Sequence, residues 1–294
     1  MTTRALRASA RLFDSLERRW ESLATQKRVA TVLVAVFVVG LVVIEARRQG
    51  WFPPAIAAHI PTQHFGAILP AFSLLLLAEV ISLVFALAKS VASAVGKQLE
   101  IMSLILIRQS FKELTHFNEP ITWGAMSDEV ARQVLYILSD ATGALLIFAL
   151  LAVYSHLQHH RPITKDADEQ SSFVAAKKFI ALLLFVGLGV IGIDVVRTWA
   201  VTGAPHSFFE VFYTLLIFAD VLVVLISMRY STAYPVVFRY FGFAVSTVLI
   251  RLALTAPRVI DAGLGVTATL FAIALTWVYN RAQRTLGEES SLAS

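Results

Sequence analysis

The feature that most constrains this chain is a series of seven apolar stretches, each about as long as a helix that crosses a lipid bilayer. A spanning helix needs about 20 mainly apolar residues. The stretches lie at 29–44, 67–88, 134–154, 179–199, 208–228, 236–254 and 259–279. Only 15% of the 294 residues are charged, whereas soluble domains carry roughly 25%. The sequence therefore predicts an all-α, polytopic membrane bundle of about seven transmembrane helices, within a range of six to eight.

These stretches divide the chain into five regions. Residues 1–28 are expected to form a cationic amphipathic helix, because Leu6, Phe13, Leu16 and Trp20 recur at helical spacing among arginines. The remaining regions are two spans at 29–88, a long amphipathic, cytoplasmic helical segment at 89–133, a five-helix bundle at 134–280 and a polar tail at 281–294. The N-terminal helix is expected to lie on anionic lipid; the alternative is packing against the protein's own loops.

The stretch at 89–117 leaves the number of crossings open. Its apolar core at 99–107 is too short to cross a bilayer and has charged neighbours. We expect it either to continue the second span as one long helix beyond the lipid, or to turn and lie along the surface. If it crossed, the excess of Lys and Arg on the N-terminal side would increase. Charge thus favours eight crossings and hydropathy favours seven. We expect seven, with a cytoplasmic N-terminus in a bacterial inner (plasma) membrane.

Four acidic residues inside the apolar stretches are the candidate functional groups: Glu79, Asp140, Asp194 and Asp220. A carboxylate at membrane depth is costly, so it usually marks a functional site or an ionic partner. Glu79 and Asp220 lie nearest the middle of their spans and have no opposite charge within one helical turn. Their uncharged form is then favoured, which suits a group that binds and releases a proton. The alternative is a neutral acid that only fixes helix packing.

Arg251 is the predicted counter-charge for these acids. Successive spans are antiparallel, so Asp140, Asp194, Arg251 and Asp261 are expected at a similar depth on one side of the bundle. We expect Arg251 to pair with Asp140 or Asp194. The alternative pairs Asp194 with Arg197, one helical turn away. Asp261 is expected near the start of a helix, where its negative charge would interact favourably with the helix dipole.

Other chemistries have weaker support. The chain contains no cysteine, which excludes disulfides and thiolate sites. His156 and His160 are one helical turn apart, but a third ligand is not evident, so a solvated interfacial cluster is favoured over a metal site. Gly187, Gly189 and Gly192 indicate close helix packing, with a broken-helix binding site as the alternative. No catalytic residue or cofactor is predicted.

The sequence favours a proton- or cation-coupled transporter or permeation protein that uses the four intramembrane carboxylates, and not an enzyme. The alternative is a non-transporting sensor or scaffold that presents residues 3–26 and 89–117 to a partner or to anionic lipid. An intramembrane metal hydrolase using His156 and His160 comes third. The expected partners are the bilayer and an unidentified small ion or molecule. A homo-oligomer stays open, and nucleic acid is not expected, because the basic residues gather before the first span.

Overall fold

The structure, a computed structural model, describes residues 3–117, 128–158, 167–202, 208–230 and 234–292, and nearly all of them are helical. The long helices are α1 (Thr3–Trp20), α2 (Leu23–Arg48), α4 (Ile68–Lys89), α5 (Val91–Glu113), α6 (Asp128–Leu157), α7 (Ala167–Thr202), α8 (Phe208–Tyr230), α9 (Tyr234–Thr255) and α10 (Ile260–Leu292). Short helical turns are α3 (Pro54–Ala57), η1 (His64–Ala67) and η2 (Leu114–His116). Among these residues, six helices are long and apolar enough to cross a membrane. The predicted all-α membrane bundle is confirmed.

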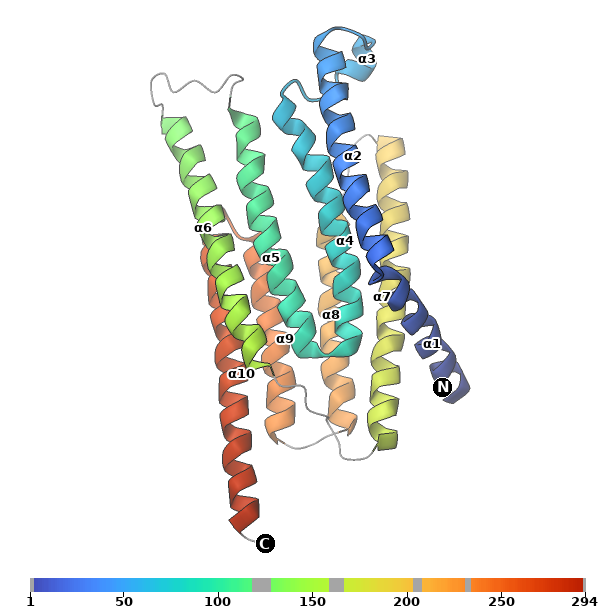
Figure 1. Cartoon of the computed structure of the whole chain (residues 1–294), viewed down its shortest axis with the longest axis vertical. Helices are drawn as coiled ribbons and strands as arrows, with labels where there is room; N and C mark the ends of the chain where they lie inside the picture. Colours follow the sequence, from blue (N-terminus) through green and yellow to red (C-terminus); the bar gives the residue numbers. More distant parts are fainter. Residues whose placement is uncertain (1–2, 118–127, 159–166, 203–207, 231–233, 293–294) are drawn as a thin grey trace.

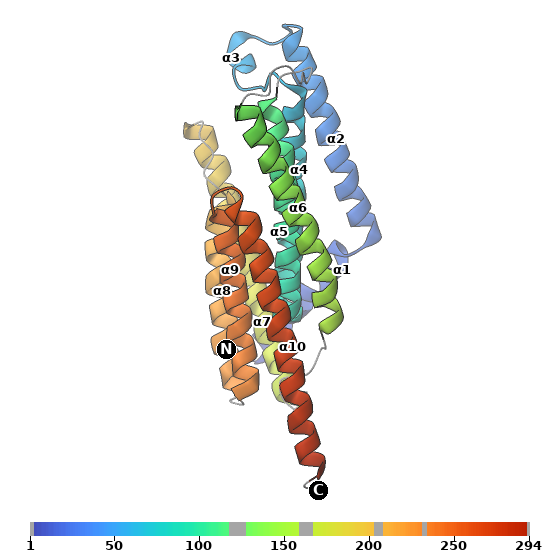
Figure 2. The ribbon, with the colours of Figure 1, turned by 90° about the vertical axis from the view of Figure 1, so that its left-hand side faces the viewer.

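The helices from α4 to α10 alternate in direction, and both chain ends lie toward the same end of the bundle (Figure 1). Helix α5 packs against α4, α6 and α9, and α10 packs against α9 and α6. The turn between α9 and α10 lies well below the upper end of α6 (Figure 2). Residues of that turn therefore meet α6 partway along its length and not at its end.

Ser90 separates α4 from α5 and reverses the chain. Its extended backbone (φ −160°, ψ 145°) ends α4, and its backbone N–H donates to the Ala86 carbonyl. Its hydroxyl then accepts from the Ser93 N–H at 3.0 Å and caps the start of α5. Serine is one of the preferred residues at this cap. The 89–117 stretch therefore neither continues the second span as one helix nor leaves the bundle, which corrects both expectations for it.

Helix α5 lies inside the bundle and not on a membrane surface. Leu99 and Leu106 are 0% exposed, and the Tyr154 hydroxyl of α6 donates to the Ala92 carbonyl at 2.9 Å. The charges around 99–107 had indicated a solvent-facing segment. Two of them, Lys97 and Glu113, instead pair with charged groups on other parts of the bundle, which makes a short apolar run compatible with burial.

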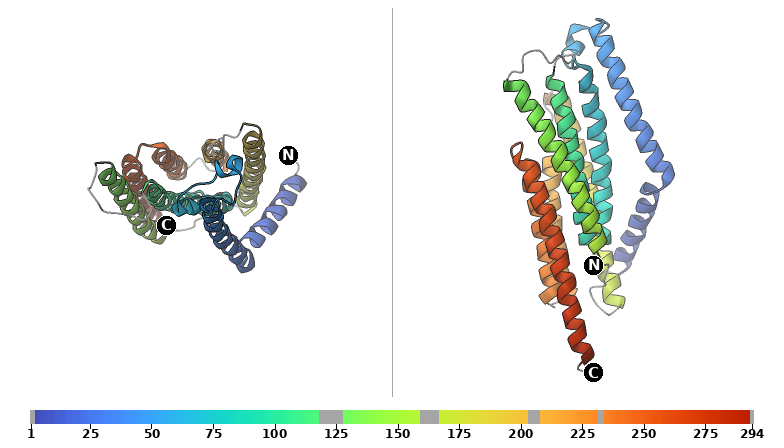
Figure 3. Two further views of the ribbon diagram at one scale, coloured as in Figure 1. Left: turned by 90° about the horizontal axis from the view of Figure 1, so that it is seen from above. Right: turned by 60° about the vertical axis from the view of Figure 1, so that its left-hand side comes forward.

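Helix α1 is amphipathic, as predicted, but it packs on spanning helices and not on loops. Phe13 is 1% exposed, and its ring lies 5.4 Å from that of Phe85 on α4. Asp14 pairs with Lys178 of α7 at 2.6 Å. Figure 3 shows α1 and α2 meeting at an angle along the edge of the bundle. Contact with anionic lipid stays a prediction for the exposed side of α1.

Candidate functional site

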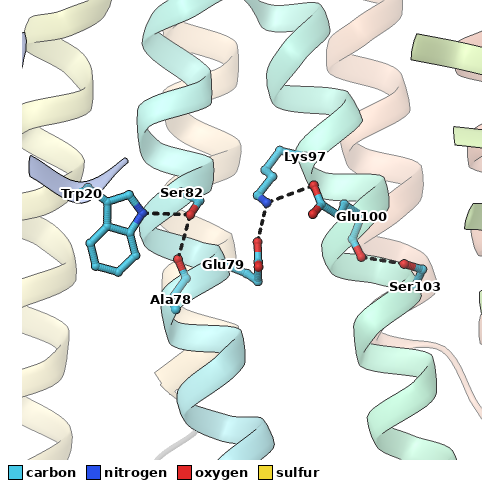
Figure 4. Close-up of polar contacts among 7 residues, drawn as sticks. All are labelled: Trp20, Ala78, Glu79, Ser82, Lys97, Glu100 and Ser103. Atoms are coloured by element: carbon cyan, nitrogen blue, oxygen red, sulfur yellow. Dashed lines mark hydrogen bonds and ion pairs between the residues drawn. The ribbon is translucent and has the colours of Figure 1, made fainter. Parts of the chain in front are cut away.

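The first ionic group joins α4 to α5. Lys97 Nζ lies 2.5 Å from a Glu79 carboxylate oxygen and 3.0 Å from Glu100 Oε2 (Figure 4). Glu79 points from α4 toward α5, while Ser82 points to the other side of α4 and accepts from the Trp20 indole N–H at 3.0 Å (Figure 4). The Glu79 side chain is 18% exposed. Glu79 therefore has an ionic partner on the next helix, which the sequence did not reveal.

The second ionic group joins α8 to α9 and is more deeply buried. Arg251 Nη2 donates to Asp220 Oδ2 at 3.0 Å, and the two side chains are 7% and 6% exposed. Arg251 Nη1 donates to the carbonyl of Tyr213, which lies on α8 like Asp220. Gln98 of α5 lies beside this pair. Arg251 therefore pairs with Asp220, and the predicted pairing with Asp140 or Asp194 is wrong.

The third ionic group forms where the α9–α10 turn meets α5 and α6. Arg258 in that turn pairs with Glu113 at the end of α5, and its Nη1 lies 4.0 Å from Asp140 Oδ2 of α6. Asp261, in the first turn of α10, is close enough to act electrostatically on Asp140. Asp140, Asp261 and Glu113 are 0%, 3% and 4% exposed. We call these four residues the acidic cluster.

The acidic cluster differs from the other two groups in its charge balance. Among the described residues, one guanidinium pairs with two buried carboxyl groups while a third, Asp261, lies close to Asp140, whereas Asp220 and Arg251 form a one-to-one pair. Neither carboxylate oxygen of Asp140 accepts a hydrogen bond from the part of the chain that the structure describes. Buried carboxylates are normally hydrogen-bonded or paired, so an uncompensated one favours binding of a proton or cation.

The backbone beside Arg258 is strained. Val259 has φ +75°, in the left-handed region that β-branched residues rarely adopt. Such a conformation costs about 1–3 kcal/mol and persists only where surrounding contacts impose it. Val259 lies between Arg258, which is held by its ionic contacts, and the start of α10. Strained backbone next to an unbalanced buried charge marks this turn as the chemically unusual part of the described molecule.

The predicted carboxylates do not share one site. Glu79, Asp140 and Asp220 each belong to a different ionic group, and all three face neighbouring helices. Asp194 lies on the exposed side of α7, and no ion pair with Arg197 occurs among the described residues. The single polar interior expected from the sequence is therefore wrong. The buried acids are distributed along the bundle, around α5 and α9.

Four members of these groups were not singled out from the sequence: Lys97, Glu100, Glu113 and Arg258. The first three belong to the 89–133 segment, which was expected outside the lipid, and Arg258 lies between two predicted spans. Asp261 does lie at the start of a helix, as expected, and its Oδ1 accepts from the Ala262 N–H at 2.7 Å. A signal for Arg258 was present: it follows Pro257 directly between two spans, a turn too short to carry it far from the helices.

The histidine cluster does not form a metal site among the residues described. His156 is exposed at the end of α6, and His160 lies outside the described residues. In the described ranges, no group of three or more His, Cys, Asp or Glu residues is arranged to hold a metal ion.

Comparison with protein-family models, with curated proteins and with solved structures gives no match to this chain.

Proposed function

We propose that this protein is a proton-coupled transport or permeation protein of the membrane, in which Asp140 is the proton-binding carboxyl group. The observation that carries the proposal is the acidic cluster, with Asp140 0% exposed, without a hydrogen-bond donor in the described ranges, and beside two more acids and one arginine. Ionisable residues within membrane helices typically belong to ion pathways or proton relays. A proton fits this cluster better than a larger cation, because Arg258 already lies among the acids.

Arg258 is the element through which a proton on Asp140 would act. With Asp140 charged, the guanidinium is shared between Asp140 and Glu113; with Asp140 neutral, it pairs with Glu113 alone. Arg258 belongs to the strained turn that joins α9 to α10. A change in its pairing therefore moves the end of α9, the helix that also carries Arg251. A bound proton can shift an equilibrium between two conformations only if its interactions differ between them.

The membrane and its orientation belong to the same proposal. The arginine-rich segment before the first span supports a cytoplasmic N-terminus, and a bacterial inner membrane is the setting that we propose. The scaffold alternative has less support, because about half of the residues of α5 are buried against other helices.

The test is proton flux in liposomes that contain the purified protein and an internal pH-sensitive dye. We expect an imposed pH gradient to dissipate faster than in protein-free liposomes, and Asp140→Asn to lower the protein-dependent rate by about tenfold or more. Asp140→Glu should retain part of the rate. Asp194→Asn is the matched control, because it removes the same charge from an exposed position on another spanning helix.

Two results would contradict the proposal. One is wild-type flux in Asp140→Asn with unchanged thermal stability. The other is equal loss in Asp140→Asn and Asp194→Asn, which would indicate an effect of charge in general. Asparagine has nearly the same shape as aspartate and removes excess negative charge, so Asp140→Asn is expected to fold.

A further inference from the structure

An apolar groove of about 850 Å³ lies on the side of the bundle where α1 approaches α4 and α7. Its volume is in the range of sites that bury most of a small ligand. The lining is almost entirely apolar. It comes mainly from α1, α4 and α7, together with Thr25 of α2 and Phe208 of α8, and includes Leu16, Trp20, Leu77, Ile81, Phe185 and Leu188. A groove of this composition on a membrane protein matches a hydrocarbon chain.

Gly189 and Gly192 of α7 keep the groove open, whereas Gly187 serves helix packing. A Cβ at Gly187 would lie 2.5 Å from Leu215 Cδ2, so Gly187 allows α7 and α8 to pack closely. A Cβ at Gly189 would meet nothing within 4 Å, and one at Gly192 would meet only Phe208 at 3.9 Å. Gly189 and Gly192 both line the groove. Helix α7 is continuous through all three, so the broken-helix alternative is wrong, and close packing explains only Gly187.

Arg19 supplies a positive charge at the edge of the groove. It lies in the last turn of α1 beside Arg18, its side chain is exposed, and no acidic residue pairs with it among those the structure describes. The other polar groups there are already bonded: the Trp20 N–H donates to Ser82, and the Thr25 hydroxyl donates to the Arg19 carbonyl at 2.8 Å. The guanidinium is therefore the group available to an anionic ligand.

We infer that this groove is a binding site for an acidic phospholipid, with an acyl chain along the floor at Gly189 and Gly192 and the phosphate at Arg19. The apolar groove fits the acyl chain of such a lipid, and the guanidinium of Arg19 at its edge fits the anionic headgroup. A zwitterionic phospholipid fits the apolar part equally but gains less from Arg19, since each Lys or Arg near an anionic headgroup contributes about 1 kcal/mol. The inference is independent of the role of Asp140.

The test uses the full chain purified in mild detergent, incubated with phosphatidylglycerol or phosphatidylcholine, and examined by native mass spectrometry. We expect the wild type to retain one phosphatidylglycerol in preference to phosphatidylcholine by about fivefold. Gly189→Leu fills the groove and should abolish retention of both lipids. Arg19→Gln should keep chain binding but remove the preference. Val190→Leu is the control, because Val190 is 61% exposed on the same helix and does not line the groove.

Three outcomes would overturn the inference. Equal retention of the two lipids by the wild type would exclude recognition of the acidic headgroup. Undiminished phosphatidylglycerol binding in Gly189→Leu would place the lipid elsewhere. Retention of a second copy of the chain, lost in Gly189→Leu, would identify the groove as a contact between subunits. A thermal unfolding curve for Gly189→Leu keeps these outcomes interpretable, and the open space at this Cβ position predicts an unchanged midpoint.

Discussion

At the scale of single residues, two buried aspartates of the bundle differ in how their charge is balanced. Asp220 is neutralised by Arg251 at 3.0 Å, whereas Asp140 shares Arg258 with Glu113 and has Asp261 close by. The sequence predicted that both lie in the membrane, because depth follows from position along an apolar stretch. It did not predict their partners, since pairing depends on which helices are neighbours and on how each is rotated.

This contrast predicts opposite effects of the same substitution. Asp220→Asn leaves Arg251 buried without its carboxylate, and we expect the free energy of unfolding to fall by about 3–5 kcal/mol. Asp140→Asn lowers the negative charge around Arg258, and we expect unchanged or higher stability. Thermal unfolding in one detergent compares the two directly. A loss in Asp140→Asn as large as that in Asp220→Asn would mean that Asp140 is held as a compensated ion and would contradict the charge balance described for the acidic cluster.

At the scale of elements, α5 shows where hydropathy stops being informative. Its apolar run is shorter than a membrane span, and Lys97 and Glu113 lie on either side of it. Both nevertheless find partners on other parts of the bundle. The six long apolar helices were predictable from length and composition, because the lipid requires uninterrupted apolar surface. Helix α5 was not, because its surroundings are mainly other helices.

Burial of α5 predicts that its faces tolerate substitution unequally. Leu99 is 0% exposed and Ile107 is 37% exposed on the same helix. Leu99→Asn places an amide in packed apolar surroundings, and we expect a loss of more than about 3 kcal/mol in unfolding free energy. Ile107→Asn should cost about 1 kcal/mol or less. Size-exclusion profiles and thermal midpoints report both. Equal, small effects would show that α5 lies at a surface, as hydropathy alone suggested.

At the scale of the whole molecule, the path of α5 decides how the chain crosses the membrane. If α5 returns through the bundle beside α4, the chain ends lie on one side, as in Figure 1. The same path of α5 brings Lys97 to Glu79 and Glu113 to Arg258. The distribution of Lys and Arg had favoured this arrangement, while the short apolar run opposed it. Charge and hydropathy favoured different numbers of crossings, because the distribution of Lys and Arg reports on the loops whereas hydropathy reports on the lipid-facing surface.

Cysteine accessibility tests this claim most directly, since the native chain contains no cysteine. Single cysteines at four exposed positions, Arg11, Trp51, Lys112 and Ser155, can be labelled with a membrane-impermeant maleimide in intact cells and in inverted vesicles. We expect Lys112→Cys to react from the same side as Trp51→Cys, and Arg11→Cys and Ser155→Cys to react from the other. Labelling of Lys112→Cys from the side of Arg11→Cys would contradict this expectation, because α5 would then not cross.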